Sequence, residues 1–215
     1  NPDATIIVSP SDHSIQNEVI FKSDMEFALA SAGNENLITF GIVPTFPATG
    51  FGYVSVKPDK NRLKTVLEFT EKPDKNKAKS LIDSGNYYWN SGMFVWSVNA
   101  VINGFKEYVP KLFDLFNAGF RILNTPDEKK FISENYPLAE NISIDYALLE
   151  KSNLINLIPA SFDWDDLGSW KSIYDLNTKD AANNVVINSK VYLNQSSNNL
   201  IKSNPNKKIV ISGLS

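Results

Sequence analysis

The sequence predicts an α/β domain, with a mixed sheet flanked by helices, followed by a short β segment. Residues 4–8 and 37–43 are short apolar runs typical of buried strands, and residues 14–32 have the apolar spacing of an amphipathic helix. This strand–helix–strand order is typical of parallel α/β sheets. From residue 183, short apolar runs alternate with turns rich in Asn and Ser, which predicts short strands in a sandwich or a β-helix. We therefore expect two domains, residues 1–180 and 181–215.

The elements between these regions follow in chain order. Residues 50–56 and 63–69 alternate and are separated by a turn cluster, which predicts a hairpin or paired strands. Residues 75–84 predict a charged helix, and residues 88–98 predict a strand interrupted by an Asn-Ser-Gly sequence. Residues 99–151 are expected to be mostly helical, with breaks at Pro110, Pro126 and Pro137. Residues 154–158 return to a strand pattern.

Composition excludes several classes of protein. The net charge of −3 argues against a nucleic-acid partner, and the lack of cysteine removes disulfides, thiolate zinc sites and cysteine nucleophiles. No apolar run approaches the roughly 18 residues of a membrane span, and no signal peptide is visible. We expect a cytoplasmic protein that does not enter a membrane. The chain lacks an initial Met and has a strand pattern close to each end, so we expect it to be an internal piece of a longer chain.

The sequence SPSDH places a carboxylate directly after the first predicted strand. Ligands of open α/β sheets bind beyond the carboxyl ends of the strands, and Asp12 there could hold Mg²⁺ together with substrate phosphates. The alternative is that Asp12 or Ser14 caps the next helix. His13 is the only histidine, and one histidine cannot build a multi-histidine metal site, so we interpret it as structural.

Three further stretches place polar groups near strand ends. In PTFPATGFGY, Gly52 would allow backbone to approach a ligand closely, or the loop is an ordinary connection. In FTEKP, Glu71 can accept hydrogen bonds from hydroxyls and Lys72 suits a phosphate, although the two could form only a surface ion pair. In WNSGMF, Asn90 is an amide within an apolar run, and its partners could be a ligand or the local backbone.

Two acidic stretches complete the set of candidates. In SIDY, Ser143 looks like a helix N-cap with Asp145 in the first turn, and Asp145 could also face a site. In WDDLGSW, two carboxylates stand between two tryptophans. Asp is almost never fully buried unless paired, so this is either a well-packed tight turn or a carboxylate held at the mouth of a cleft.

Taken in order, these blocks resemble the mannose-1-phosphate guanylyltransferases, a family of sugar-nucleotide nucleotidyltransferases. The matching blocks span residues 9–170 and read SPSDH, PTxPxTGFGY, FTEKP, WNSGMF, SIDYALLEK and DWDDLGSW. The resemblance implies a Rossmann-like (GT-A-like) nucleotidyltransferase fold that lacks its N-terminal part here. The segment after residue 183 looks like the start of the family's left-handed β-helix-like region. The DLGSW turn is similar to that of long bacterial members, some of which carry a mannose-6-phosphate isomerase domain.

The resemblance also implies a reaction and a metal. The reaction is Mg²⁺-dependent transfer of GMP from GTP to mannose 1-phosphate, giving GDP-mannose and pyrophosphate for surface polysaccharide. The metal would be held by Asp12 and Asp166, with the tryptophans and Gly168 fixing the turn that carries Asp166. Asp166 and Lys72 would be the catalytic residues.

The sugar phosphate would bind to five residues by the same resemblance. Gly52, Glu71 and Asn90 would lie against the sugar, with Glu71 accepting from vicinal hydroxyls. Lys72 would neutralise the phosphate, and Asp145 would assist from the start of its helix.

Two departures from the family pattern affect these expectations. Phe46 and Ala48 stand where the family usually has Arg and Glu, and the Gly-rich signature GGxGTRLxPLS is absent with no substitute phosphate loop. We therefore expect this piece alone to be inactive. Other readings are a nucleotidyltransferase for another sugar 1-phosphate, a bifunctional protein with an isomerase domain, or a non-catalytic sugar-phosphate binding module. Exposed edges of the C-terminal strands could support a homodimer.

Overall fold

The computed structural model describes residues 4–33 and 36–215, which fall into two compact units. The first unit contains residues 4–11 and 15–164, and the second contains residues 12–14 and 165–215. Residues 165–180 are thus grouped with the C-terminal β segment, whereas the sequence places a boundary near residue 180. That domain boundary stays a prediction.

The first unit is built on one six-stranded sheet with the order β1-β5-β2-β6-β4-β3. Strands β2 and β6 are parallel and the other neighbours are antiparallel, so the sheet is mixed, as predicted. Strand β3 also pairs with the first residues of β5, which joins the last strand of the order back to the long strand. The strands are β1 (Thr5–Val8), β2 (Leu37–Ile42), β3 (Tyr53–Val56), β4 (Lys64–Thr70), β5 (Tyr87–Ser97) and β6 (Ile155–Pro159).

Strand β1 differs from its sequence prediction in its surroundings. Its apolar pattern predicts a buried strand, but β1 lies at the edge of the sheet, and Ile6, Ile7 and Val8 are 36%, 46% and 41% exposed. The long strand β5 lies between β1 and β2 and pairs antiparallel with both. The order strand–helix–strand therefore gives two strands of the same direction that are not neighbours.

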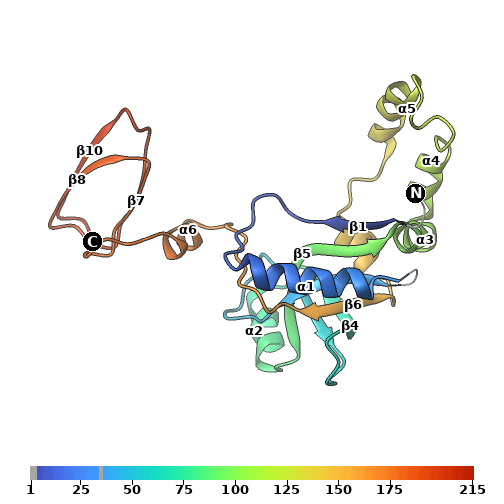
Figure 1. The fold of residues 1–215 in the computed structure, drawn as a ribbon, viewed down its shortest axis with the longest axis horizontal. Coiled ribbons are helices and arrows are strands. Elements are labelled where there is room, and N and C mark those ends of the chain that lie inside the picture. Colours follow the sequence, from blue (N-terminus) through green and yellow to red (C-terminus); the bar gives the residue numbers. More distant parts are fainter. Residues whose placement is uncertain (1–3, 34–35) are drawn as a thin grey trace. The chain divides into compact units, whose positions relative to one another are not determined.

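Helix α1 (Glu18–Ser31) covers one face of the sheet (Figure 1). Its N-cap is Asn17, whose side chain accepts a hydrogen bond from the Ile20 N–H at 3.1 Å. The alternative prediction, that Asp12 or Ser14 caps this helix, is therefore wrong. The helix buries Ala28 in a core cluster formed with Ile38, Phe40, Met93, Val95, Ile158 and Phe162.

A buried charge also ties α1 to the rest of the first unit. Asp24 is only 2% exposed, and its carboxylate accepts hydrogen bonds from the Arg62 guanidinium and from the Ser161 N–H. The Arg62 guanidinium also lies 4.2 Å from the centre of the Phe27 ring. Because the buried carboxylate is paired on both oxygens, its desolvation is offset. The pairing joins α1 to the loop that follows β6.

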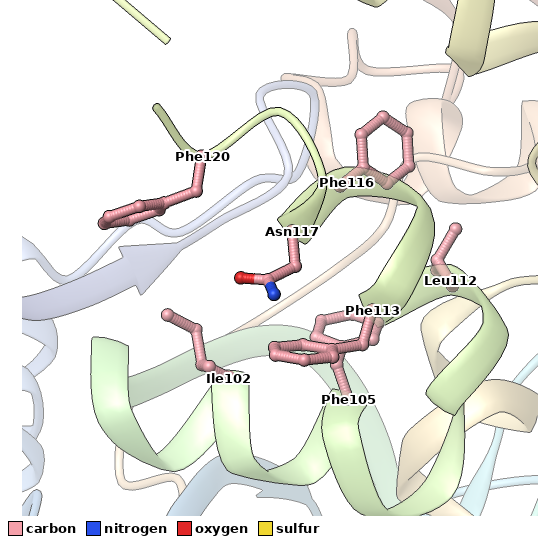
Figure 2. A pocket seen from close by; sticks show the side chains of 7 residues that line it. All are labelled: Ile102, Phe105, Leu112, Phe113, Phe116, Asn117 and Phe120. Atoms are coloured by element: carbon pink, nitrogen blue, oxygen red, sulfur yellow. The ribbon is translucent and has the colours of Figure 1, made fainter. Parts of the chain in front are cut away.

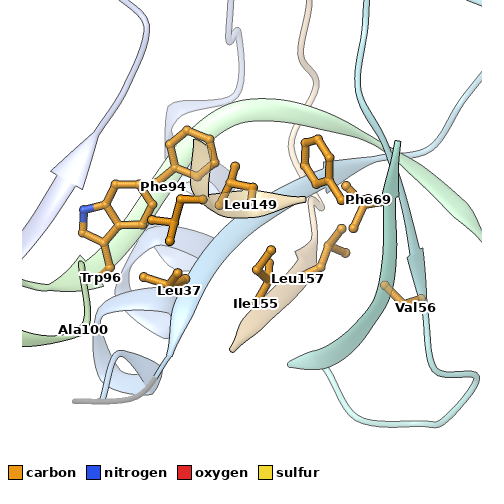
Figure 3. Packing of buried hydrophobic residues seen from close by; sticks show 11 residues of the cluster. Leu37, Val56, Phe69, Phe94, Trp96, Ala100, Leu149, Ile155 and Leu157 are labelled. Carbon is orange, nitrogen blue, oxygen red and sulfur yellow. The ribbon is translucent and has the colours of Figure 1, made fainter. Parts of the chain in front are cut away.

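The opposite face of the sheet carries the second large core cluster, shown in Figure 3. Alternate residues of β2 serve the two faces, with Leu37 in this cluster and Ile38 beneath α1. Helix α3 (Val98–Tyr108) and a single π-helical turn, η2 (Asp145–Leu149), cover this face. The cluster comprises Leu37, Val54, Val56, Phe69, Phe94, Trp96, Ala100, Leu148, Leu149, Ile155 and Leu157.

The remaining helices of the first unit agree with the predicted breaks. Helix α2 (Lys75–Asp83) is capped by Asp74, and α4 (Pro110–Asn117) begins at the predicted break with Pro110 in its first turn. Pro126 lies in the turn before α5 (Glu128–Asn135). Helix α5 ends at Asn135, and Pro137 lies within the short 3₁₀ helix (Tyr136–Leu138) that follows it.

The second unit contains α6 (Trp170–Leu176) and four short strands, β7 (Val185–Ile187), β8 (Lys190–Asn194), β9 (Leu200–Lys202) and β10 (Lys208–Ser212). Strand β7 is parallel to β9, and β8 is parallel to β10. Successive coils therefore stack on one another, as in a β-helix, and the sandwich alternative is not supported. The buried Asn184 connects two coils, since its Oδ1 accepts from the backbone and side-chain N–H groups of Asn199 at 3.1 and 2.9 Å.

Candidate functional site

The five residues predicted to bind a sugar phosphate meet in the first unit. Gly52 precedes β3, Glu71 and Lys72 follow β4, Asn90 lies within β5, and Asp145 begins η2. The Asn90 N–H donates to the Gly52 carbonyl at 2.8 Å, and the Asn90 Nδ2 donates to Asp145 Oδ1 at 3.2 Å. Lys72 Nζ lies 3.2 Å from Glu71 Oε1. Four segments far apart in sequence thus place these groups in contact.

Gly52 makes room for the Glu71 carboxylate. A methyl group added at Gly52 would lie 2.5 Å from Glu71 Oε2 and 3.0 Å from the Phe69 ring. Such a contact is too short for a carbon and an oxygen, so any larger residue would displace Glu71 or the backbone. The predicted close approach to the Gly52 backbone is therefore made by Glu71.

Asn90 lies at a bulge of β5. The strand is continuous where an interruption was expected, but its register with β2 shifts, since Thr39 pairs with Phe94 and Gly41 pairs with Asn90. Gly92 supports the bulge with a φ of +73°. The Asn90 Oδ1 accepts from the Thr39 hydroxyl at 2.8 Å and from the Gly92 N–H at 3.3 Å. The partners of this amide are thus Thr39, Asp145 and Gly92.

The site is acidic and partly buried. Burial raises the pKa of Glu71, whose side chain is only 7% exposed, and repulsion from Asp145 raises it further, while Lys72 opposes both effects. Burial likewise raises the pKa of Asp145, against the lowering effect of hydrogen bonds from its own backbone and from Ser143. The Lys72 side chain is 59% exposed. The site therefore combines a partly buried pair of acidic acceptors with a solvent-accessible cation.

Sequence reasoning missed Glu150, which contacts the same site. Its Oε1 accepts the backbone N–H of Glu71 at 3.0 Å. Two residues five positions apart point to different sides of an α-helix, so the expected helix gave no reason to group Glu150 with Asp145. In the π-helical turn, the Glu150 N–H instead donates to the Asp145 carbonyl at 2.8 Å. Ser143 directly precedes the helical residues and its carbonyl accepts the Ala147 N–H at 2.9 Å, as predicted for an N-cap position, while the residue before the π-helical turn itself is Ile144.

The two predicted metal ligands both lie in the second unit. Ser14 and Asp165 form an antiparallel bridge, with backbone hydrogen bonds of 2.8 and 3.1 Å in both directions. Asp12 stands two residues before Ser14 and Asp166 one residue after Asp165. Because the two segments run antiparallel, Asp12 and Asp166 both lie beyond the same end of this bridge.

The turn that carries Asp166 is fixed by its own backbone. The Gly168 N–H donates to Asp166 Oδ1 at 3.0 Å, and the Leu167 N–H donates to Asp165 Oδ1 at 2.7 Å. A side chain at Gly168 would begin 2.6 Å from Asp166 Oδ2. Of the two tryptophans that flank this stretch, Trp170 is 66% exposed and begins α6, so it does not provide the packing expected of it.

The donor set of Asp12 and Asp166 suits Mg²⁺ held jointly with a substrate. Mg²⁺ is usually bound through one or two carboxylates, with water and substrate phosphates as its other ligands. Within residues 4–33 and 36–215, no group of three or more His, Cys, Asp and Glu side chains could hold a metal ion. The two aspartates therefore fit a shared site and not a cage made only of protein ligands.

The loop with the two departures from the family pattern is held by aromatic packing. The Phe46 ring lies 4.9 Å from that of Trp89, and the Phe51 ring lies 5.0 Å from Trp89 and 5.4 Å from Trp164. The Ala48 carbonyl accepts from the Tyr53 hydroxyl at 2.9 Å. Phe46 thus contributes a ring contact, and Ala48 a backbone hydrogen bond, at the two positions where the family pattern predicts charged side chains.

A separate cavity of about 530 Å³ lies between α3 and α4 (Figure 2). None of the predicted site residues lines it. Its walls are apolar apart from one amide, so it does not suit a sugar phosphate. The lining residues are Ile102, Phe105, Leu112, Phe113, Phe116, Asn117 and Phe120.

Comparisons with known proteins agree with the sequence blocks. Residues 1–183 match the family model described as nucleotidyl transferase. The chain is 36% identical over 186 residues to a mannose-1-phosphate guanylyltransferase of Sinorhizobium fredii, a match that covers 86% of this chain and 36% of that protein. It is 35% identical over 187 residues to the xanthan biosynthesis protein XanB of Xanthomonas campestris, with 85% and 39% covered. The chain thus spans less than half the length of these curated relatives.

A solved structure is similar over nearly the whole chain. The crystal structure described as mannose-1-phosphate geranyltransferase from Thermus thermophilus superposes with a TM-score of 0.85 at 24% identity, covering 98% of this chain and 61% of that one. This likeness confirms the predicted α/β fold with its C-terminal β region. In the part of the chain that the structure describes, no helix is both long and apolar enough to cross a membrane.

Proposed function

The chain belongs to the nucleotidyl transferase family, and on that premise we propose that the protein carrying it transfers GMP from GTP to mannose 1-phosphate. The observation that carries the proposal is a pair of contacts, Lys72 with Glu71 and Asn90 with Asp145, together with the electrostatic coupling of Glu71 to Asp145. These contacts place hydroxyl acceptors near a cation that suits a phosphate. The names of the relatives from Sinorhizobium fredii and Xanthomonas campestris support mannose 1-phosphate as the acceptor and polysaccharide synthesis as the use of the product.

The sugar phosphate would be recognised by the residues of the first unit. The Glu71 carboxylate would accept hydrogen bonds from vicinal sugar hydroxyls, and Asp145 would add a second acidic acceptor. Lys72 would turn from Glu71 to the phosphate, since its side chain is exposed and its charge is a flexible point charge. Asn90 would hold Asp145 in place through the 3.2 Å hydrogen bond.

In the proposed reaction, a phosphate oxygen of mannose 1-phosphate attacks the α-phosphorus of GTP. A new P–O bond forms, the bond between the α-phosphorus and its bridging oxygen breaks, and pyrophosphate leaves with that oxygen. Asp12 and Asp166 would hold Mg²⁺, which when bound neutralises phosphate charge and orients both substrates. The protein contributes position and charge, because phosphoryl-type transfer needs no protein nucleophile.

Several finer expectations remain predictions. They are a cytoplasmic location, a homodimer, and an isomerase domain elsewhere in the protein. The roles of Asp12, Lys72 and Asp166, and the identity of the metal, belong to the proposal and rest on the resemblance together with the geometry above.

The test is a pyrophosphate-release assay on the full-length protein with GTP, Mg²⁺ and mannose 1-phosphate. We expect release that depends on mannose 1-phosphate, and a loss of kcat/KM on the order of 100-fold or more in Asp166→Asn. The matched control is Asp165→Asn, which changes the neighbouring carboxylate and should retain most of the activity. Release that Asp166→Asn leaves unchanged would contradict the metal assignment. Failure to release pyrophosphate with any sugar 1-phosphate and nucleotide would favour a binding module.

A further inference from the structure

Glu150 makes a contact that its charge alone does not favour. Its Oε1 accepts the Glu71 N–H at 3.0 Å, which brings a third carboxylate to a site that already holds Glu71 and Asp145. The negative charge of Glu150 raises the pKa of both of those carboxyl groups, although it is the smallest of the causes acting on each. Because Glu150 is exposed to solvent, its charge is screened, and the hydrogen bond to the Glu71 N–H is the specific contact that it makes with this site.

The hydrogen bond lies where β4 stops being held by the sheet. Thr70 is the last residue of β4 that pairs with β3, so the Glu71 N–H has no partner in the ladder. The next residue, Lys72, has a φ of +44°, and its N–H donates to the Phe51 carbonyl at 3.2 Å. The turn that carries the Glu71 and Lys72 side chains is therefore held by two hydrogen bonds. The Glu71 N–H donates to Glu150, and the Lys72 N–H donates to Phe51.

The position of Glu150 depends on the π-helical turn. The turn begins at Asp145, whose side chain binds Asn90, and ends where the Glu150 N–H donates to the Asp145 carbonyl. Ala147, Leu148 and Leu149 are buried and anchor the turn against the sheet. One turn, anchored by buried side chains, thus presents Asp145 to Asn90 at its start and Glu150 to the Glu71 backbone at its end.

We propose that Glu150 is a positioning residue for sugar-phosphate recognition, which holds the Glu71–Lys72 turn through its acceptor oxygen and not through its charge. Without this bond, one of the two backbone hydrogen bonds described above is lost, and Glu71 is less firmly held against Gly52. The inference rests on the proposed function, because it concerns the same sugar-phosphate site.

The test compares Glu150→Gln with Glu150→Ala in the full-length protein. Gln retains an acceptor oxygen at nearly the same position and removes the charge, while Ala removes both. We expect KM for mannose 1-phosphate to stay within about twofold in Glu150→Gln and to rise about tenfold in Glu150→Ala, the latter a loss of about 1.4 kcal/mol. We expect kcat to change little in either variant, because Glu150 contacts neither reacting phosphate in this proposal.

Amide hydrogen exchange gives a readout that does not depend on catalysis. The Glu71 amide should lose protection in Glu150→Ala and keep it in Glu150→Gln, while the Lys72 amide stays protected in both. Circular dichroism and thermal unfolding confirm that each variant is folded. A Glu71 amide with equal protection in all three proteins would overturn the proposal.

The kinetic outcomes separate the two levels of inference. An equal rise of KM in both variants would assign the effect to the charge and contradict the positioning role, as would an unchanged KM in Glu150→Ala. If the unmodified protein neither binds nor turns over mannose 1-phosphate, the proposed function fails. The exchange of the Glu71 amide then still decides whether Glu150 holds the turn.

Discussion

At the scale of single residues, the candidate site depends on the fit between Gly52 and the Glu71 carboxylate. We expect Gly52→Ala to displace Glu71, because the added methyl group would lie 2.5 Å from Oε2. The displacement should raise KM for mannose 1-phosphate about tenfold and destabilise the fold by about 1–2 kcal/mol, as overpacking does. Steady-state kinetics and urea unfolding measure the two effects.

The chain offers a matched control in the same loop. Gly50 has open space around its Cα and no atom within 4 Å of an added methyl group, so Gly50→Ala should leave both KM and stability near those of the unmodified protein. If Gly52→Ala has the same KM and stability as Gly50→Ala, then sugar-phosphate binding does not depend on the position of the Glu71 carboxylate beside Gly52.

The ionised form of Asp145 destabilises the folded state. Burial raises the pKa of its carboxyl group, so the folded state binds more protons than the unfolded state in the window above the ordinary value of about 3.8. Stability therefore falls as pH rises through this window. We expect Asp145→Asn to raise Tm at pH 8 by about 2 °C while weakening the binding of mannose 1-phosphate.

The pH dependence is the discriminating measurement for Asp145. Well below the ordinary value of about 3.8 both states carry the protonated acid, so the gain in Tm of Asp145→Asn should disappear there. A gain that persists unchanged at low pH would show that the substitution acts through packing and not through the charge.

At the scale of elements, the approach to α1 is held by a carboxylate from a distant loop. Asp163 accepts the Gln16 N–H at 2.8 Å and the Asn17 N–H at 2.9 Å, directly before the first turn of the helix. We expect Asp163→Ala to lower the free energy of unfolding by about 1 kcal/mol, since the side chain is exposed and water can partly replace it. Urea denaturation of the two proteins measures the difference.

The pH dependence of this effect follows from the same bonds. Burial alone raises the pKa of Asp163, but the N–H groups of Gln16 and Asn17 more than offset it, and the net pKa lies below the ordinary value. The contribution of Asp163 should therefore be complete above the ordinary pKa and vanish as pH falls through the lowered one. Asp127→Ala is the control, because Asp127 precedes α5 without a side-chain capping bond.

Local sequence patterns predicted which segments form strands better than they predicted where each strand lies in the sheet and how buried it is. The apolar runs gave β2 and β6, and the turn cluster gave the hairpin of β3 and β4, because those signals are local. The same reasoning misjudged β1, since an apolar run does not reveal whether a strand lies at an edge. It also did not predict the π-helical turn at Asp145, because the sequence does not distinguish an α-turn from a π-turn.

At the scale of the whole molecule, the site residues that resemblance supplied fall into two groups. Gly52, Glu71, Lys72, Asn90 and Asp145 lie in the first unit, and Asp12 and Asp166 lie in the second. The resemblance indicated each residue but gave no reason for this division. Glu150 escaped the prediction because its contribution is a backbone contact 79 positions away, which no local pattern records.

This division predicts that sugar-phosphate binding and metal binding can be separated. Because all five sugar-phosphate candidates belong to one unit, mannose 1-phosphate should raise the Tm of the full-length protein in the presence of EDTA and without GTP. At a ligand concentration of about 100 times Kd the stabilisation should be about 2.7 kcal/mol. Asp166→Asn should keep this shift and Glu71→Ala should lose it. A shift that requires Mg²⁺, or that Asp166→Asn abolishes, would mean that the two groups act only as one site.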